Sequence, residues 1–278
     1  MDYIEVLLHI EPESTGTEIM IALLSQIGYE SFMESEGGLH AYISVSDFKV
    51  ADLILLQQMQ EGNITFSYSH QQLKSQNWNE VWESNFNPVL ISDKVFVRAP
   101  FHKVNKSVDY EIIIEPKMSF GTAHHDTTAM MIELMLQEDL RHRYILDMGS
   151  GTGILSILAE MLGAAKILAI DIDEWAYNNA VENIKRNNCR KVRVVLGSAG
   201  YLTNEKFDYI LANINRNILL EDMEIYSRHL ASGGSVLLSG FYSADLKAIE
   251  DCAKGFGLNP DKTMMKMDWT AAVFRKPL

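Results

Sequence analysis

The chain has 278 residues, and its 47% hydrophobic and 22% charged residues are typical of a globular protein with a sizeable core. A net charge of −13 argues against nucleic acid as the main partner, because binding to phosphates relies on Lys and Arg. No apolar run is long enough to cross a bilayer, the first residues lack a secretory pattern, and the two cysteines lack metal-ligand spacing. We therefore expect a cytoplasmic protein that has no membrane attachment and no metal site. We also expect no sequence-specific binding to nucleic acid.

The first 75 residues are much more acidic than the rest of the chain. They contain 11 Asp or Glu and only two basic residues, Lys49 and Lys74, for a net charge of −9 that leaves −4 for the remainder. Such a segment repels anions and attracts basic surfaces, although an acidic surface that only keeps the protein soluble is the simpler interpretation.

The same residues predict a small domain with the order β-α-β-β-α-β. Four segments have strand patterns: 2–10, 30–35, 39–45 and 63–69. Gly37 and Gly38 indicate a hairpin between the second and third strands, and the two helices are expected to begin at Ser14 or Thr15 and at Ser46. This order is the ferredoxin-like arrangement, and because none of its residues looks catalytic we expect a binding module.

A connector is expected over residues 76–118. Trp78 and Trp82 lie four residues apart on one face of a predicted helix that ends at Pro88, and we interpret both as structural. Two strand patterns lead into the next domain, at 94–101 and 110–116. The predicted organisation is therefore an acidic ferredoxin-like domain at 1–75, a connector at 76–118 and a ligand-binding domain at 119–278.

The last of these segments alternates between strand and helix patterns. Strand patterns lie at 144–148, 166–171, 191–197, 207–214, 235–240 and near 263–275. Helical patterns lie at 127–140, 154–162, 174–187, near 216–230 and from about 243. This alternation predicts an α/β domain with a parallel, doubly wound sheet, whose ligands bind at the carboxyl ends of the strands.

A glycine-rich loop in "YILDMGSGTGILS", residues 144–156, falls at one such strand end. Its glycines, Gly149, Gly151 and Gly153, have the spacing G-x-G-x-G rather than the G-x-G-x-x-G of dinucleotide sites. Asp147 precedes the loop, where a carboxylate would oppose a pyrophosphate and favour a ligand with an ammonium and a sulfonium, such as S-adenosylmethionine. Asp171 ends the next strand, where an acid accepts hydrogen bonds from ribose hydroxyls.

Two further segments bring polar groups to the same edge of the predicted sheet. Asn213 ends the strand pattern "FDYILANI", and its side-chain carbonyl can accept a hydrogen bond from an amine. The turn "FGTAHHDTT", residues 120–128, carries two histidines. We interpret His124 as a solvated loop residue, whereas His125 either relays a proton or only shapes the loop.

Together, "FGTAHHDTT", "LDMGSGTGILSILAEMLGAAKILAIDID" and "ILANI" resemble the ribosomal protein L11 methyltransferases, which have the Rossmann-like class I S-adenosylmethionine-dependent fold. The resemblance extends from about "NWNEVWESNF" to the carboxyl terminus. It implies cofactor contacts at Thr128, Gly149, Asp171 and Asn213. Ala123 and Asp126 stand where the family often has glycine and proline, which puts the shape of that turn in doubt. Ser198 follows the third strand, where many class I enzymes have an acid near adenine.

The resemblance implies repeated methylation of lysine ε-amino and N-terminal α-amino groups on one large-subunit ribosomal protein, free or on the ribosome, by a monomeric enzyme. It also implies that the acidic front recognises the substrate. A class I methyltransferase acting on a small-molecule amine or a glutamine amide is the alternative, although "ANINR" lacks the two prolines of the glutamine enzymes. A nicotinamide oxidoreductase is opposed by Asp147 and the glycine spacing, and a non-catalytic scaffold by the retained cofactor loop.

Overall fold

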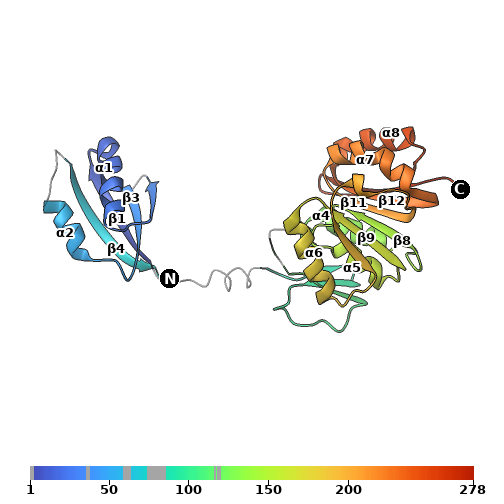
Figure 1. The fold of residues 1–278 in the computed structure, drawn as a ribbon, viewed down its shortest axis with the longest axis horizontal. Helices are drawn as coiled ribbons and strands as arrows, with labels where there is room; N and C mark the ends of the chain where they lie inside the picture. Colours follow the sequence, from blue (N-terminus) through green and yellow to red (C-terminus); the bar gives the residue numbers. More distant parts are fainter. Residues whose placement is uncertain (1–2, 36–37, 59–63, 74–85, 116, 118–119) are drawn as a thin grey trace. The chain divides into compact units, whose positions relative to one another are not determined.

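A computed structural model describes residues 3–35, 38–58, 64–73, 86–115, 117 and 120–278. The chain divides into two compact units, Met1–Asn85 and Phe86–Leu278, and each is described by itself (Figure 1). Trp78 and Trp82, for which the sequence predicts a structural role in a connector, lie outside the described residues. No helix in the described ranges combines the length and the apolar character that crossing a membrane requires.

The first unit is an antiparallel sheet in the order β2-β3-β1-β4 with both helices on one face. Its elements are β1 Tyr3–Glu11, α1 Glu13–Gln26, β2 Ser31–Ser35, β3 Gly38–Ser44, α2 Val50–Gln58 and β4 Thr65–Leu73. Alternate residues of β1, such as Val6 and Leu8, are fully buried against Leu24 of α1 and Leu53 of α2. The predicted ferredoxin-like arrangement is therefore confirmed.

Both helix starts predicted in this unit are wrong. The first helix begins at Glu13, because the Pro12 carbonyl accepts the first helical hydrogen bond, from the Gly16 backbone N–H at 3.0 Å, with no side-chain cap. The second begins at Val50, because the backbone N–H groups of Asp47 and Phe48 bond to the Ser44 carbonyl in a separate turn. Ser46 hydrogen-bonds to Ser44 in that turn, 2.8 Å between the two Oγ atoms, and caps no helix.

A small three-stranded sheet opens the second unit. Its strands are β5 Val89–Ile91, β6 Val95–Arg98 and β7 Tyr110–Ile113. The sequence did not indicate β5, whose three residues are too few to show a period. Buried residues of this sheet, including Val97 and Ile112, belong to the same core cluster as Met130 of α4. Part of the predicted connector is thus built into the core of the second unit.

The main sheet has seven strands in the order β10-β9-β8-β11-β12-β14-β13. They are β8 Tyr144–Met148, β9 Lys166–Asp171, β10 Val192–Leu196, β11 Phe207–Asn213, β12 Leu230–Tyr242, β13 Asn259–Lys266 and β14 Trp269–Arg275. The first five in this order are parallel, as predicted. β14 is antiparallel to both neighbours. A two-residue turn joins it to β13, and a turn this short can connect only antiparallel strands, because parallel strands need a much longer crossover.

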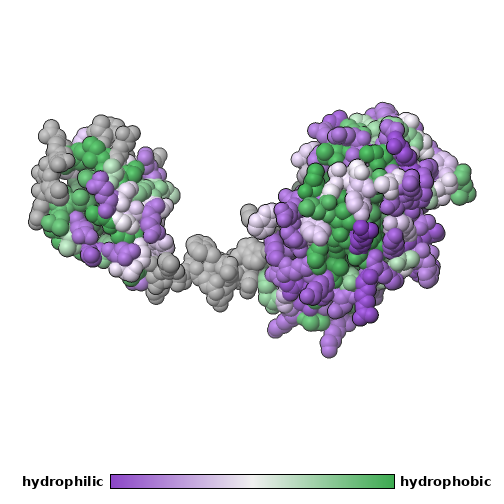
Figure 2. Space-filling view, viewed as in Figure 1, coloured by the Kyte–Doolittle hydropathy of each residue, from purple (hydrophilic) through white to green (hydrophobic). Residues whose placement is uncertain are grey.

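Helices cover both faces of this sheet (Figure 1). They are α4 Asp126–Met135, α5 Ile154–Met161, α6 Glu174–Arg186, α7 Arg216–His229 and α8 Leu246–Gly255. The first three share one hydrophobic core with one side of the sheet, and α7 and α8 share another with the opposite side. On the face drawn in Figure 2, hydrophobic residues gather over the middle of this unit and hydrophilic residues surround them.

Successive residues of each strand point to opposite faces of this sheet, which decides where a polar side chain lies. In β8, Leu146 and Met148 face the core under α7 and α8, whereas Ile145 faces the core under α4 to α6. Asp147 therefore points toward the α5 side of the sheet. The doubly wound architecture predicted from the sequence is confirmed, and it brings the ends of β8, β9, β10 and β11 to one edge.

Candidate functional site

A cavity of about 1160 Å³ lies at this edge of the second unit. Six of the residues singled out in the sequence line it: His125, Gly149, Gly151, Asp171, Ser198 and Asn213. Three others, Thr128, Asp147 and Gly153, are described by the structure but are not among the lining residues. Six of the nine residues therefore meet at one cavity, and the other three do not line it.

The glycine loop is shaped by close backbone contacts that leave no room for side chains. A Cβ at Gly151, where φ is +54°, would lie 2.4 Å from the Phe120 carbonyl oxygen. A Cβ at Gly149, where φ is +69°, would lie 2.2 Å from a methyl carbon of Ile214. Gly153 instead occupies the N-cap of α5 with φ +78°. Gly149 and Gly151 thus leave backbone at the cavity wall, where a ligand can approach closely.

Asp171 is held rigidly at the end of β9. One carboxylate oxygen accepts from the Gly151 backbone N–H at 2.7 Å, and the other accepts from the Asp173 N–H at 3.0 Å. Each carboxylate oxygen has a further lone pair, so both remain able to accept from hydroxyl groups in the cavity. Asp171 therefore ties the two loops together and presents its carboxylate to the cavity.

We expect Asp171→Ala to weaken the binding of S-adenosylmethionine by tenfold or more. Hydrogen bonds to a charged group contribute roughly 1.5–3 kcal/mol each, and a factor of ten in affinity corresponds to about 1.4 kcal/mol. Asp208→Ala is the matched control, since Asp208 also accepts a backbone N–H, from Tyr144 at 2.8 Å, but at the opposite end of the strands. The measurement is titration calorimetry on the folded variants. Wild-type dissociation constants in both variants would refute a role for Asp171 in binding S-adenosylmethionine.

Asp147 lies beneath the glycine loop rather than at its mouth. Its side chain is 1% exposed, and one oxygen accepts a hydrogen bond from the Ser156 hydroxyl at 2.7 Å. Burial raises the pKa of this carboxyl to about 6, and the nearby Asp171 also raises it, against the Ser156 hydrogen bond. The expectation that the Asp147 carboxylate meets a ligand at the mouth of the loop is therefore wrong, because this carboxyl is buried against Ser156 of α5.

The raised pKa makes stability depend on pH in a definite direction. The folded protein holds this proton more tightly than the unfolded chain, so Asp147 lowers stability as pH rises from about 4 through about 6. We expect the free energy of unfolding of wild type, measured with urea, to fall by up to about 3 kcal/mol over that range relative to Asp147→Asn. The figure comes from a pKa difference of about two units, at about 1.4 kcal/mol for each unit. Parallel pH profiles of the two proteins would contradict a buried, titrating Asp147.

Asn213 presents an unsatisfied oxygen to the cavity. Its amide nitrogen donates to the Thr128 hydroxyl at 3.2 Å, which fixes the orientation of the amide. The amide oxygen is buried and has no hydrogen-bond partner among the described residues. An unpaired buried carbonyl is costly, which is typical of a group that a ligand completes. Thr128, fully buried behind Asn213, positions this amide and does not line the cavity itself.

The two histidines have different surroundings. His125 caps α4, and its Nδ1 accepts from the Thr127 backbone N–H at 3.3 Å. A neutral ring with that bond carries its proton on Nε2 and has no second lone pair to offer, which favours the loop-shaping interpretation over the proton relay. His124 is exposed but not merely solvated, since its Nε2 lies 2.8 Å from the Asn87 carbonyl.

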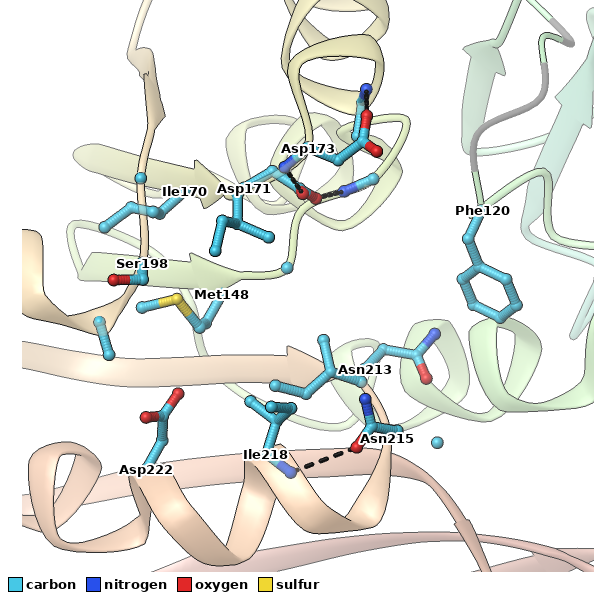
Figure 3. Close-up of a pocket in the computed structure, with 18 of the residues that line it drawn as sticks. Phe120, Met148, Ile170, Asp171, Asp173, Ser198, Asn213, Asn215, Ile218 and Asp222 are labelled. Atoms are coloured by element: carbon cyan, nitrogen blue, oxygen red, sulfur yellow. Dashed lines mark hydrogen bonds between the residues drawn. The ribbon is translucent and has the colours of Figure 1, made fainter.

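Several lining residues were not singled out in the sequence. They include Ile172, Ile218, Asp222 and Phe120. In Figure 3 Asp222 lies on the same side of the cavity as Ser198, and Phe120 lies on the other side. In Figure 3 the Asp222 carboxylate points from α7 toward Met148. The spacing of Ile218 and Asp222, four residues apart on one helical face, is a signal that the sequence contains. This spacing indicates cavity-lining residues only when it is known that α7 borders the cavity.

The sequence of this chain is similar to those of known methyltransferases. The model of the family described as ribosomal protein L11 methyltransferase (PrmA) matches residues 11–277. The ribosomal protein L11 methyltransferase of Porphyromonas gingivalis is 45% identical over 263 residues, 94% of this chain and 91% of that protein. The protein of the same name from Phocaeicola vulgatus is 41% identical over 281 residues, 99% of each.

Solved structures give the same result. A crystal structure of ribosomal protein L11 methylase from Lactobacillus delbrueckii subsp. bulgaricus is similar with a TM-score of 0.64 and 26% identity, covering 69% of this chain and all of that one. The family match runs over nearly the whole sequence, and relatives at 41–45% identity cover both units. The protein therefore belongs to the ribosomal protein L11 methyltransferase family.

Proposed function

We propose that this protein transfers methyl groups from S-adenosylmethionine to lysine ε-amino groups and the N-terminal α-amino group of ribosomal protein L11. The observation that carries the proposal is the Asn213 amide oxygen, buried, unpaired and fixed by Thr128 in a cavity at the carboxyl edge of the sheet. Membership of the family supports the choice of substrate. Since ribosomal proteins are made in the cytoplasm, the proposal places the enzyme there.

The residues of the cavity suit S-adenosylmethionine. Gly149 and Gly151 allow close approach of the ligand, and Asp171 is positioned to accept from ribose hydroxyls. Asp147, ionised at neutral pH because its pKa is about 6, supplies a buried negative charge that favours a cationic ligand. When bound, the sulfonium provides an electrophilic methyl group with an excellent leaving group. The protein's task is then alignment, for which well-oriented groups are very effective.

Asn213 supplies that alignment on the acceptor side. Its oxygen accepts a hydrogen bond from the amine N–H, which directs the nitrogen lone pair into the cavity. The lone pair forms the new C–N bond as the methyl–sulfur bond breaks and leaves its electron pair on sulfur. A lysine, whose unperturbed pKa is about 10.4, must lose a proton to water before each transfer, and a partly dry site lowers that pKa.

We further propose that the acidic front unit recognises the substrate. Residues 1–75 carry a net charge of −9, and a lysine-bearing segment presents the complementary charge. All the described residues that line the cavity belong to the second unit, so the first unit is available for a separate task such as recognition.

The proposed function is tested by methyl transfer from labelled S-adenosylmethionine to purified, unmethylated L11. Label in L11 is the expected result, and free lysine and glutamine peptides serve as acceptors for the small-molecule and amide alternatives. Binding of NADH without any response to S-adenosylmethionine would contradict the proposed reaction.

A further inference from the structure

Four aromatic rings form a continuous row beside Asn213. Phe120 and His125 have ring centroids 5.2 Å apart, and His125 meets Trp269 edge-on at 4.8 Å. Trp269 in turn stacks on Tyr242 at 4.3 Å. We call these four residues the ring array. Its members come from three separate segments of the chain, so the row is a product of the tertiary fold.

Backbone contacts fix each part of the ring array. The Phe120 carbonyl accepts from the Thr152 backbone N–H at 3.0 Å, which ties this residue to the glycine loop. His125 caps α4. Tyr242 and Trp269 are register partners in the β12–β14 pairing. His125, Tyr242 and Trp269 therefore stand on a helix cap and on paired strands, and Phe120 stands on a loop that is bonded to the glycine loop.

The ring array belongs to the acceptor end of the cavity. Phe120, His125 and Trp269 line the cavity together with Asn213. In Figure 3 the Asn213 amide points toward the side where Phe120 lies, whereas Ser198 and Asp222 lie at the opposite end. Phe120 and Tyr242 are each 51% exposed, so neither ring is placed there to fill the core.

We propose that the ring array binds the alkylammonium head of the acceptor and of its methylated products. The inference rests on the proposed function and adds a second recognition element to the same site. Each methylation replaces an N–H donor, so neither the neutral dimethylated amine nor the trimethylated cation has a donor left for the Asn213 oxygen. Attraction between a cation and aromatic faces needs no N–H and is the known basis for recognition of quaternary ammonium groups.

The two elements therefore act on different forms of the substrate. Asn213 orients the neutral primary and secondary amines through their N–H groups, and the ring array holds the cation that each transfer produces. The neutral dimethylated nitrogen has no N–H, so the ring array alone contacts it before the third transfer. An aliphatic wall in the same place would only desolvate that cation and so oppose its formation. This division allows one site to carry a nitrogen through successive methylations.

The test is a binding comparison on the full-length protein saturated with S-adenosylhomocysteine. The probes are Nα-acetyl-Nε-trimethyllysine amide and its neutral isostere, in which carbon replaces the quaternary nitrogen. We expect the cation to bind about 5- to 30-fold more tightly in wild type. Phe120→Leu and Trp269→Leu should each reduce that ratio toward one, and Phe120→Tyr should preserve it.

Phe256→Leu is the matched control, because Phe256 is 40% exposed and is not among the cavity-lining residues. It should keep the wild-type ratio. Equal binding of both probes to wild type, no detectable binding of the cation, or an unchanged ratio in Phe120→Leu would overturn the proposal. If wild type nevertheless methylates L11, the proposed function stands and only the ring array is wrong. If L11 is not methylated while the ratio holds, the proposed substrate is wrong and the cation site remains.

Discussion

Asn213→Ala is expected to lower the rate of methyl transfer to L11 by about 100-fold. Loss of the amide oxygen leaves the acceptor amine without an orienting partner, and small misplacements of reacting groups cost on this order. Binding of S-adenosylhomocysteine should fall no more than about tenfold, the value of about one hydrogen bond. Stopped-time assays with saturating cofactor separate the two effects, because they report the transfer step rather than cofactor binding.

Thr128 provides the matched pair for this experiment. Thr128→Val keeps the shape of the buried side chain but removes the hydroxyl that accepts from the Asn213 amide nitrogen at 3.2 Å. The amide is then free to rotate, and we expect a rate loss of about tenfold, corresponding to about 1.4 kcal/mol. Thr128→Ser restores the hydroxyl and should recover most of the rate. Wild-type rates in both Asn213→Ala and Thr128→Val would exclude Asn213 as the orienting group.

Removal of the front unit is expected to lower methylation of L11 strongly while cofactor binding persists. A chain from Gln76 to Leu278 retains the whole cavity and both cores of the second unit. We expect S-adenosylmethionine to bind within about threefold of the full-length value, and L11 methylation to fall by about 100-fold, if docking contributes about 3 kcal/mol. Calorimetry and transfer of labelled methyl groups measure the two quantities on the same preparation.

Salt and charge reversal provide the controls for that truncation. Exposed charges are screened beyond about 8–10 Å at physiological ionic strength, so added salt should raise the KM for L11 in the full-length enzyme. Reversing exposed acids of the front unit, such as Glu11 and Glu34, to Lys should raise the same KM more than that for the cofactor. A folded, truncated enzyme that methylates L11 at the full-length rate would show that the front unit does not recognise the substrate.

The elements that border the cavity were predictable because their signals are local. The strand at 144–148 and the strand at 166–171 have the bounds that their apolar runs indicate. Gly149 and Gly151 were recognisable because a backbone position with positive φ and no room for a Cβ atom favours glycine, which the sequence shows directly. Helix starts were less predictable, since Ser14 and Ser46 look like caps in the sequence while neighbouring turns decide the outcome.

Relations across the fold could not be predicted from the sequence. Whether Asp147 faces the ligand or the core depends on the strand period and on α5 packing above it, where Ser156 meets the carboxylate. The support of Asn213 by Thr128 joins residues 85 positions apart. The ring array joins Phe120 and Trp269 through His125, and no local pattern indicates that these rings meet.

The most direct test of the proposed function is intact-mass and peptide mass spectrometry of purified, unmethylated L11 after incubation with the full-length enzyme and S-adenosylmethionine. We expect L11 to gain whole methyl groups, located on lysine side chains and on the amino terminus, with trimethylated products among them. The Asn213→Ala enzyme should leave most of the L11 unmodified over the same time. L11 that gains no mass from a folded wild-type enzyme that binds S-adenosylmethionine would contradict the proposed function.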